Sequence, residues 1–411
     1  MTPDERRATR IPAFNLLWGA ETLAVLGQQF SVLALPLLAA VSLKASPVQM
    51  GLLAACETAP FLLLSLPAGV LVDRLPKRRV MIWMNLLRAL TLLLVPLAAL
   101  LGVLRLEVLY VVAFLIGSFG AFFYVAYQSM LPDLVPDTAL ADANSKLEAS
   151  SAGAEVVGPG LAGAVIGVIG GVAAIWMNIG TFLVSAILLG NLRLSERPTP
   201  NTAPRLFVAQ LLEGLAFVWS HPIIRPLMLC ASTLNVAEGL VNAVLVLYLS
   251  RNLHLTPTQI GLIYVGSNIG TLLGAVLSER FALQVTPGRA AVLAALFAGI
   301  GMVFTPLAGI LGTLAVPVLL LSRSLYGFGR LMFFVQHITL RQSQTPPELQ
   351  GRMHASVRFL AGGVFPLSAL IGGALAQRYG IPAVLLLAAL IGASAWLWVA
   401  RSDVMRGRTA A

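Results

Sequence analysis

The sequence predicts an all-α membrane protein with twelve transmembrane helices in two pseudo-symmetric six-helix bundles. The 411 residues are 58% hydrophobic and only 11% charged, whereas soluble domains carry roughly a quarter charged residues. Twelve apolar runs are long enough to cross a bilayer, and basic residues alternate between the connections that join them. Because lipid cannot satisfy exposed backbone groups, we expect nearly every residue to be helical.

The twelve predicted spans lie between polar or Pro/Gly breaks. A hydrocarbon core of ~30 Å needs about 20 apolar residues in a helix that rises ~1.5 Å per residue. The runs that meet this length are 12–41, 47–73, 77–102, 107–131, 142–169, 172–192, 224–250, 257–281, 288–311, 314–342, 350–377 and 382–401. The first run is too long for a signal peptide and is therefore a membrane span.

The basic residues set the predicted orientation. Eighteen of the 27 Lys and Arg residues lie in the termini and the even-numbered connections, whereas the odd-numbered connections hold four, namely Lys44, Arg105, Arg251 and Arg378. Under the positive-inside rule this bias places both termini in the cytoplasm. The net charge of +10 therefore reflects topology, and we expect no nucleic-acid partner.

The longest polar break, SERPTPNTAPRL from Ser195 to Leu206, divides the chain near its middle. We expect residues 1–194 to form an N-terminal six-helix bundle, 195–221 a cytoplasmic linker with an amphipathic helix, and 222–411 a C-terminal six-helix bundle. The stretch SPVQMGLL at Ser46 is echoed by TPTQIGLI at Thr256. In both, Ser or Thr is the expected N-cap and Pro the first helical residue, which indicates duplication. Two such halves with a site between them are typical of transporters.

The densest charge lies in GVLVDRLPKRR, residues 69–79, between the second and third spans. It resembles the loop Gly-x-Leu-x-Asp-Arg-x-Gly-Arg-Lys of the major facilitator superfamily, with Pro76 where that family usually has Gly. The sequence looks most like the branch that contains enterobactin exporters and macrolide efflux proteins. The matching positions are Gly69, Leu71, Asp73 and Arg74, while Lys77 and Arg78 keep the two basic positions.

The resemblance implies that this loop is a cytoplasmic gate. We expect Asp73 to pair near residues 348–352, with Arg352 as its partner, and Asp133 to neutralise Arg78 or Arg79. The expected gate residues are Gly69, Asp73, Arg74, Lys77, Arg78, Arg79, Asp133 and Arg352. The alternative is that the basic cluster only enforces topology, but Asp73 contributes nothing to that role, so we favour the gate.

The fifth span contains GAEVVGPGLAG, residues 153–163. Small residues let helices approach closely, and an internal proline bends the helix. This stretch resembles the Gly-Pro motif of facilitator-type exporters and antiporters, with Gly153, Gly158, Pro159 and Gly163 as its residues. The resemblance implies export, whereas the residues alone also suit tight packing between the two halves.

Eight ionisable side chains lie deep in the predicted spans, where burial is costly and therefore points to function. The acids are Glu21, Glu57, Glu155 and Glu238, and the bases are Arg88, Arg323, Arg330 and Arg358. A low-dielectric surrounding favours the neutral form of a carboxyl group, so all four acids are proton-coupling candidates, with Glu21 and Glu238 the first choices. We expect Arg88 and Glu57 to form a structural pair, and Glu155 and Arg358 to bridge the halves.

Helical phase gives the polar faces of four spans. By the family resemblance the first, fourth, seventh and tenth spans line a central cavity, and these spans carry the clearest polar faces. The predicted cavity residues are Gln28, Tyr124, Tyr127, Gln128, Asn235, Asn242, Arg323, Tyr326 and Arg330. The alternative is that these faces only hydrogen-bond helices together.

The leading functional hypothesis is a secondary active transporter of the cytoplasmic (inner) membrane. It would export small amphipathic organic molecules, of drug or siderophore type, by proton antiport and alternating access. The alternatives are a lipid or lysolipid flippase or a solute importer of the same fold, and a membrane-embedded enzyme. The four histidines are scattered and no nucleotide-binding loop is present. We therefore expect no catalysis, cofactor or metal, and a monomer whose partners are a small-molecule substrate, protons and the lipid bilayer.

Overall fold

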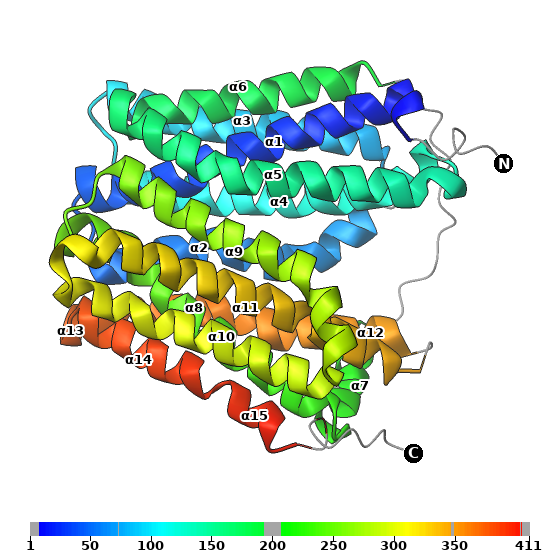
Figure 1. The fold of residues 1–411 in the computed structure, drawn as a ribbon. Helices are drawn as coiled ribbons and strands as arrows, with labels where there is room; N and C mark the ends of the chain where they lie inside the picture. The colour runs from blue at the N-terminus through cyan, green and yellow to red at the C-terminus, as the bar shows by residue number, and fades with distance from the viewer. Residues whose placement is uncertain (1–7, 73, 193–206, 347–348, 403, 405–411) are drawn as a thin grey trace. The chain divides into compact units, whose positions relative to one another are not determined.

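The chain is helical throughout the computed structural model, which describes residues 8–72, 74–192, 207–346, 349–402 and 404 (Figure 1). No β-strand occurs among these residues. The α-helices are α1 (Pro12–Leu37), α2 (Pro47–Val72), α3 (Lys77–Leu100), α4 (Leu106–Leu134), α5 (Asp137–Ile169), α6 (Gly171–Gly190), α7 (Phe207–Ser220), α8 (Ile224–Leu247), α9 (Pro257–Gln284), α10 (Pro287–Leu307), α11 (Ala315–Ser343), α12 (Gln350–Val357), α13 (Gly363–Tyr379), α14 (Ile381–Ser394) and α15 (Trp396–Ala400).

Twelve helical segments within the described residues are long and apolar enough to cross a membrane. They follow the order of the twelve runs in the sequence, which confirms the predicted all-α membrane fold. The spans that begin with α1 and α8 end in π-helical turns, Leu38–Ser42 and Tyr248–Asn252. The eleventh span is built from α12, a π-helical turn at Arg358–Gly362, and α13.

The backbone shows the duplication more clearly than the sequence does. Six described residues have positive φ, and they form three pairs in which the partners lie 210 residues apart: Lys44 and His254, Gly102 and Gly312, Gly170 and Gly380. All three pairs lie in the odd-numbered connections between spans. Equal spacing at three separate turns is the mark of one six-helix unit that occurs twice.

The starts of α2 and α9 repeat in the same register. Ser46 N–H donates to Gln49 Oε1 over 2.7 Å, and Gln49 N–H donates back to Ser46 Oγ over 3.3 Å. Thr256 and Gln259 form the same reciprocal pair, with distances of 2.9 and 3.3 Å. This is a capping box, which satisfies backbone N–H groups that a helix start leaves without partners. The predicted N-caps are therefore present, together with a glutamine partner.

Two compact units make up the chain. Unit 1 comprises Met1–Ala45, Cys56–Thr202 and Thr256–Gly261, and unit 2 comprises Ser46–Ala55, Ala203–Leu255 and Leu262–Ala411. Each unit thus includes the first turns of one helix whose remainder belongs to the other unit, namely α9 for unit 1 and α2 for unit 2. The predicted boundary region 195–206 lies outside the described residues, and α7 follows it within unit 2.

Glycines hold these exchanged turns. In unit 1 a Cβ at Gly163 of α5 would lie 2.6 Å from Pro257 O and 3.0 Å from Gly261 Cα. In unit 2 a Cβ at Gly373 of α13 would lie 3.1 Å from Gly51 Cα. Gly163 and Gly373 are again 210 residues apart, so the same helix crossing is built twice. Only glycine permits backbones to approach this closely.

Each unit has its own apolar core. The unit 1 core includes Phe14, Leu17, Met81, Met130, Leu147 and Leu189, all fully or almost fully buried. The unit 2 core includes Leu227, Cys230, Ala295, Met302 and Met332. A smaller cluster packs α7 against α8 and α12 through Val218, Ile224 and Met353. These cores set the rotation of the helices and hence the side chains that each helix turns toward its neighbours.

Candidate functional site

Unit 1 contains a partly buried acid and a buried base on separate helices. Glu21 lies in the middle of α1, and Arg88 lies in the middle of α3. The two charges interact electrostatically. Glu57 of α2, the partner expected from the sequence, shows no such interaction with Arg88, whose charge interacts with Glu21 of α1 instead.

Two aromatic rings enclose Arg88. Its guanidinium carbon lies 5.3 Å from the ring centroid of Phe123 on α4 and 5.0 Å from that of Phe182 on α6. A cation over an aromatic face is stabilised by the ring quadrupole, and more strongly where water is excluded. Gly120, one turn before Phe123, makes room for this arrangement, because a Cβ there would lie 2.5 Å from Arg88 Nη2.

Hydrogen bonding around this pair is incomplete. Glu21 Oε2 and Arg88 Nε are buried and have no hydrogen-bond partner in the described structure. Buried polar atoms of this kind are uncommon, and each one calls for an explanation such as a functional role or a bound water. The Glu21 carboxyl is thus deep in the unit, near a positive charge, and not fixed by a direct ion pair among the described residues.

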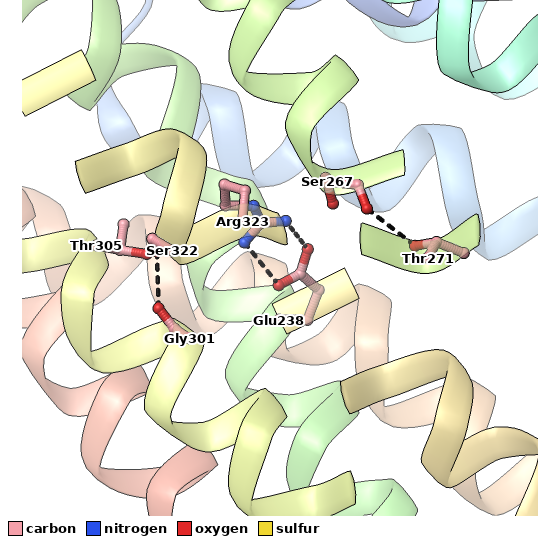
Figure 2. Close-up of polar contacts among 7 residues, drawn as sticks. All are labelled: Glu238, Ser267, Thr271, Gly301, Thr305, Ser322 and Arg323. Carbon is pink, nitrogen blue, oxygen red and sulfur yellow. Dashed lines mark hydrogen bonds and ion pairs between the residues drawn. The ribbon is translucent and has the colours of Figure 1, made fainter. Parts of the chain in front are cut away.

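Unit 2 contains a tight ion pair (Figure 2). Arg323 of α11 donates two hydrogen bonds to Glu238 of α8, with Nη2 2.7 Å from Oε1 and Nη1 3.3 Å from Oε2. The two side chains are only 6% and 16% exposed. The guanidinium also lies 4.7 Å from the ring centroid of Tyr326. Bidentate geometry orients a guanidinium and a carboxylate in one plane and makes the contact specific.

Neighbouring hydroxyl contacts hold α11 in place beside this pair. Ser322 donates to Gly301 O over 2.7 Å, and its hydroxyl lies 2.8 Å from Thr305 Oγ1, which joins α11 to α10 (Figure 2). Ser324, on the other side of Arg323, donates to Gly266 O of α9 over 2.8 Å. The residues before and after Arg323 therefore bond to two different helices, and this fixes the rotation of α11.

The remaining predicted cavity residues differ in their surroundings. Asn235 donates to Ala361 O over 2.7 Å, so it joins α8 to the π-helical turn in the eleventh span. Tyr127 and Tyr326 are buried. Gln128 donates to Tyr124 Oη over 3.3 Å, and both side chains are exposed. Gln28 is partly buried, and Asn242 and Arg330 are exposed.

The other deep charges remain predictions. Glu57 is partly buried on α2 and forms no ion pair with the described residues. Glu155 of α5 and Arg358 are both exposed side chains that take part in interactions. Their expected bridge between the halves stays a prediction.

The predicted gate contains a different set of ion pairs from the one expected. Asp133 pairs with Lys77 over 2.7 Å and not with Arg78 or Arg79. Arg78 instead donates to Leu189 O over 2.8 Å and to Gly190 O, the carbonyls that end α6. A cation suits this place because the C-terminal carbonyls of a helix carry partial negative charge. The sequence did not show that α6 ends beside the start of α3.

Arg352, the expected partner of Asp73, forms an ion pair with Glu213. Asp73 and Glu348 lie outside the described residues, while Arg352 donates to Glu213 of α7 over 2.5 Å. Arg74 and Arg79 are exposed, and a Cβ at Gly69 would meet no atom within 4 Å. The function of this loop as a gate therefore stays a prediction.

The Gly-Pro motif of α5 is a close-packing surface at two of its residues. A Cβ at Gly158 would contact the side chain of Gln29 of α1, and Gly163 meets the first turn of α9. Pro159 lies inside the helix without breaking it. A Cβ at Gly153 would meet no atom within 4 Å, so that glycine is not required for packing.

Unit 2 also contains a cluster of His337, Arg341 and His354 that was not among the site residues predicted from the sequence. His337 of α11 stacks on Phe333, with ring centroids 5.7 Å apart, and Arg341 Nη2 lies 2.9 Å from His354 Nδ1. His337 Nε2 and Arg341 Nε have no hydrogen-bond partner among the described residues. The spacing of His337 and Arg341 on one helix face was visible in the sequence, but their approach to α12 was not. The described residues contain no group of three His, Cys, Asp or Glu side chains that could hold a metal ion.

A duplicated bundle of twelve membrane helices, with a buried arginine in each half and a nearly buried ion pair in the second, defines a membrane transporter of the two-bundle class. A family model described as Major Facilitator Superfamily matches residues 17–237 and 227–409. The chain therefore belongs to the Major Facilitator Superfamily, and it is a transporter of that family.

Characterised relatives cover most of the chain. It is 30% identical over 391 residues to the multidrug efflux pump Tap of Mycolicibacterium fortuitum, an alignment that covers 92% of each protein. It is 28% identical over 343 residues to the enterobactin exporter EntS of Citrobacter koseri, covering 79% of each.

Solved structures show the same fold at low sequence identity. The nucleoside transporter NupG superposes with a TM-score of 0.78 at 12% identity, covering 94% of this chain and 99% of NupG. A bacterial homolog of the human lysosomal transporter Spinster superposes with a TM-score of 0.72 at 14% identity, covering 100% of both chains.

Proposed function

We propose that this protein exports small amphipathic organic molecules across the cytoplasmic membrane in exchange for protons, by alternating access of its two halves. The similarity to an efflux pump and a siderophore exporter supports the direction of transport. The charge bias of the connections supports cytoplasmic termini.

The observation that best supports proton coupling is the environment of the Glu21 carboxyl group. Its Oε2 is buried without a hydrogen-bond partner, while Arg88 is near enough to interact with its charge. Such a carboxyl can take up a proton without first breaking an ion pair, and Arg88 favours its release again because it stabilises the carboxylate. Glu21 is therefore the proposed proton carrier.

Glu238 has a different role from Glu21 in this proposal. Two hydrogen bonds from Arg323 hold its carboxylate, so protonation of Glu238 would have to displace a charge-assisted contact. In this proposal the ion pair between Glu238 and Arg323 holds α8 against α11. Protonation of Glu238 would neutralise its carboxylate and so release Arg323. The sequence alone ranked Glu21 and Glu238 equally, and the difference in pairing separates them.

Proteoliposomes with pyranine trapped inside test the coupling. With an acidic lumen, addition of ethidium, tetracycline or erythromycin outside should raise the luminal pH as protons leave and the cargo enters. Glu21→Gln should abolish this change while cargo binding to the purified protein persists. Glu107→Gln, at an exposed glutamate in the first turn of α4, is the matched control and should behave as the unmodified protein. Proton release that persists in Glu21→Gln would remove Glu21 from the coupling.

The same assay separates the two acids. If Glu238→Gln, and not Glu21→Gln, uncouples proton flux from cargo, the carrier lies in unit 2. Cargo movement without any proton flux in the unmodified protein would contradict proton antiport altogether.

A further inference from the structure

A groove on unit 1 has no part in the transport proposal. It has a volume of about 520 Å³ and lies where the end of α2, the start of α3 and the middle of α4 meet. Its lining is apolar except for one cation, and it includes Leu71, Leu75, Trp83, Phe119, Phe122 and Arg79. Volumes of 300–1,000 Å³ are usual for sites that take a small ligand.

The groove opens at the surface of the unit. Leu71, Leu75 and Trp83 are 48%, 45% and 61% exposed. These helices cross the membrane, and Trp residues concentrate at the depth of the lipid headgroups. The groove is therefore open at the surface of unit 1 near the α2–α3 connection, with the side chain of Trp83 on its exposed side.

Arg79 is the one charged residue among the described residues that line the groove. Arg79 is exposed and forms no hydrogen bond or ion pair with them. Arg74 is exposed in the same connection, while Lys77 and Arg78 are engaged with Asp133 and the end of α6. A cationic amphipathic cargo would be repelled here, whereas an anionic headgroup would be attracted. Basic pockets between membrane helices on the cytoplasmic side suit anionic lipid headgroups.

We propose that this groove binds one anionic phospholipid of the leaflet next to the α2–α3 connection, with an acyl chain in the apolar slot and the phosphate on Arg79. Bound there, the lipid spans α2, α3 and α4 beside the Lys77–Asp133 ion pair. It would couple the lipid composition of the membrane to the packing of the predicted gate loop.

Native mass spectrometry of the full-length protein, offered equal amounts of phosphatidylglycerol and phosphatidylcholine with the same acyl chains, tests this site. One basic residue near a membrane surface contributes about 1 kcal/mol to anionic lipid binding, so we expect about a fivefold preference for phosphatidylglycerol. Arg79→Gln should remove that preference. Arg74→Gln removes the same charge from the same connection but does not line the groove, and it should keep the preference.

A steric variant and an optical readout make the test independent of Arg79. Leu75→Trp should fill the slot and lower retention of both lipids. Phosphatidylglycerol brominated on its acyl chains should quench fluorescence in the unmodified protein more than in Trp83→Phe, because Trp83 lines the slot. Equal loss of preference in Arg74→Gln and Arg79→Gln, or equal quenching with and without Trp83, would overturn the proposal. So would displacement of the bound lipid by ethidium, which would assign the groove to cargo.

Discussion

Arg323 and Glu238 join α11 to α8 by two hydrogen bonds in the interior of unit 2. The pair is nearly buried, and a buried charge without its partner is far less stable than one in water. The contact therefore fixes the register of two helices that are separated by 85 residues along the chain.

Removal of Arg323 alone should destabilise the protein more than removal of both partners. Arg323→Gln leaves Glu238 without its counter-charge, and breaking a buried pair costs about 3–5 kcal/mol. The double variant Arg323→Gln with Glu238→Gln should recover a large part of that loss, as measured by thermal unfolding of the purified protein. Arg330→Gln, at an exposed position of the same helix, should change stability by less than about 0.5 kcal/mol. Equal melting temperatures for the single and double variants would contradict a coupled pair.

Arg88 should not tolerate replacement by lysine. A guanidinium can lie flat against Phe123 and Phe182 together, whereas an ammonium is a compact and strongly hydrated charge. We expect Arg88→Lys and Phe182→Leu each to lower stability by up to about 2 kcal/mol. Because the two side chains touch, their effects should not add in a double-mutant cycle followed by chemical unfolding. Additive losses, to within about 0.5 kcal/mol, would show that the aromatic contact contributes nothing.

Gly163 and Gly180 should respond in opposite ways to alanine. At Gly163 the new methyl group would lie 2.6 Å from Pro257 O, whereas at Gly180 it would meet no atom within 4 Å. We expect Gly163→Ala to destabilise by about 1–3 kcal/mol through overpacking. Gly180→Ala should stabilise by up to about 1 kcal/mol, because alanine is the better helix former. Thermal unfolding of both variants measures the difference, and a neutral Gly163→Ala would mean that α5 and the start of α9 separate freely.

Replacing Lys44 with glycine should stabilise the folded protein. The φ of Lys44, 51°, is a left-handed conformation that costs a side-chain-bearing residue roughly 1–2 kcal/mol. Lys44→Gly should therefore raise the melting temperature. Lys44→Ala removes the charge and the long side chain but keeps the unfavourable φ, so it should not do so. His254, with φ 52°, is the equivalent position in the second half, so His254→Gly should raise the melting temperature as well. A higher melting temperature for only one of the two glycine variants would argue that the two turns are not equivalent.

His221 should make stability depend on pH. Its Nδ1 accepts hydrogen bonds from Ile223 N and Ile224 N at 3.2 and 3.4 Å, at the start of α8. Burial lowers the pKa of this imidazole, so the folded state binds the proton less well than the unfolded state does. Its stabilising contribution is thus fully present above an unfolded pKa of about 6.5 and is lost as the pH falls from that value through the lower pKa of the folded state. His221→Asn keeps an acceptor and should flatten this part of the stability–pH curve, and an unchanged slope would contradict it.

The positions of the helices could be read from the sequence because hydrophobicity and length are local properties. The N-caps at Ser46 and Thr256 and the order of the spans follow from residues that are close in the chain. The depth of Glu21, Arg88, Glu238 and Arg323 followed from counting residues along each helix.

The pairing of charges could not be read in this way. The sequence suggested Glu57 for Arg88 and Arg78 or Arg79 for Asp133, whereas the structure brings Glu21 to Arg88 and Lys77 to Asp133. Depth restricts a side chain to a layer of the membrane, but several helices cross each layer. Which side chains meet depends on the rotation of each helix about its axis. That rotation is set by packing between residues far apart in the sequence, such as the close approach of Arg88 to Gly120.

The sequence by itself determined an all-α, duplicated, twelve-span membrane protein, because the cost of exposing backbone and charge to hydrocarbon leaves few alternatives. Only the tertiary structure decided that Glu238 is held by Arg323 while Glu21 Oε2 lacks a hydrogen-bond partner among the described residues. Only the tertiary structure also showed that Lys44 and His254 share one strained backbone conformation at equivalent turns. These features arise from contacts between residues far apart in the chain, whose geometry no local pattern encodes.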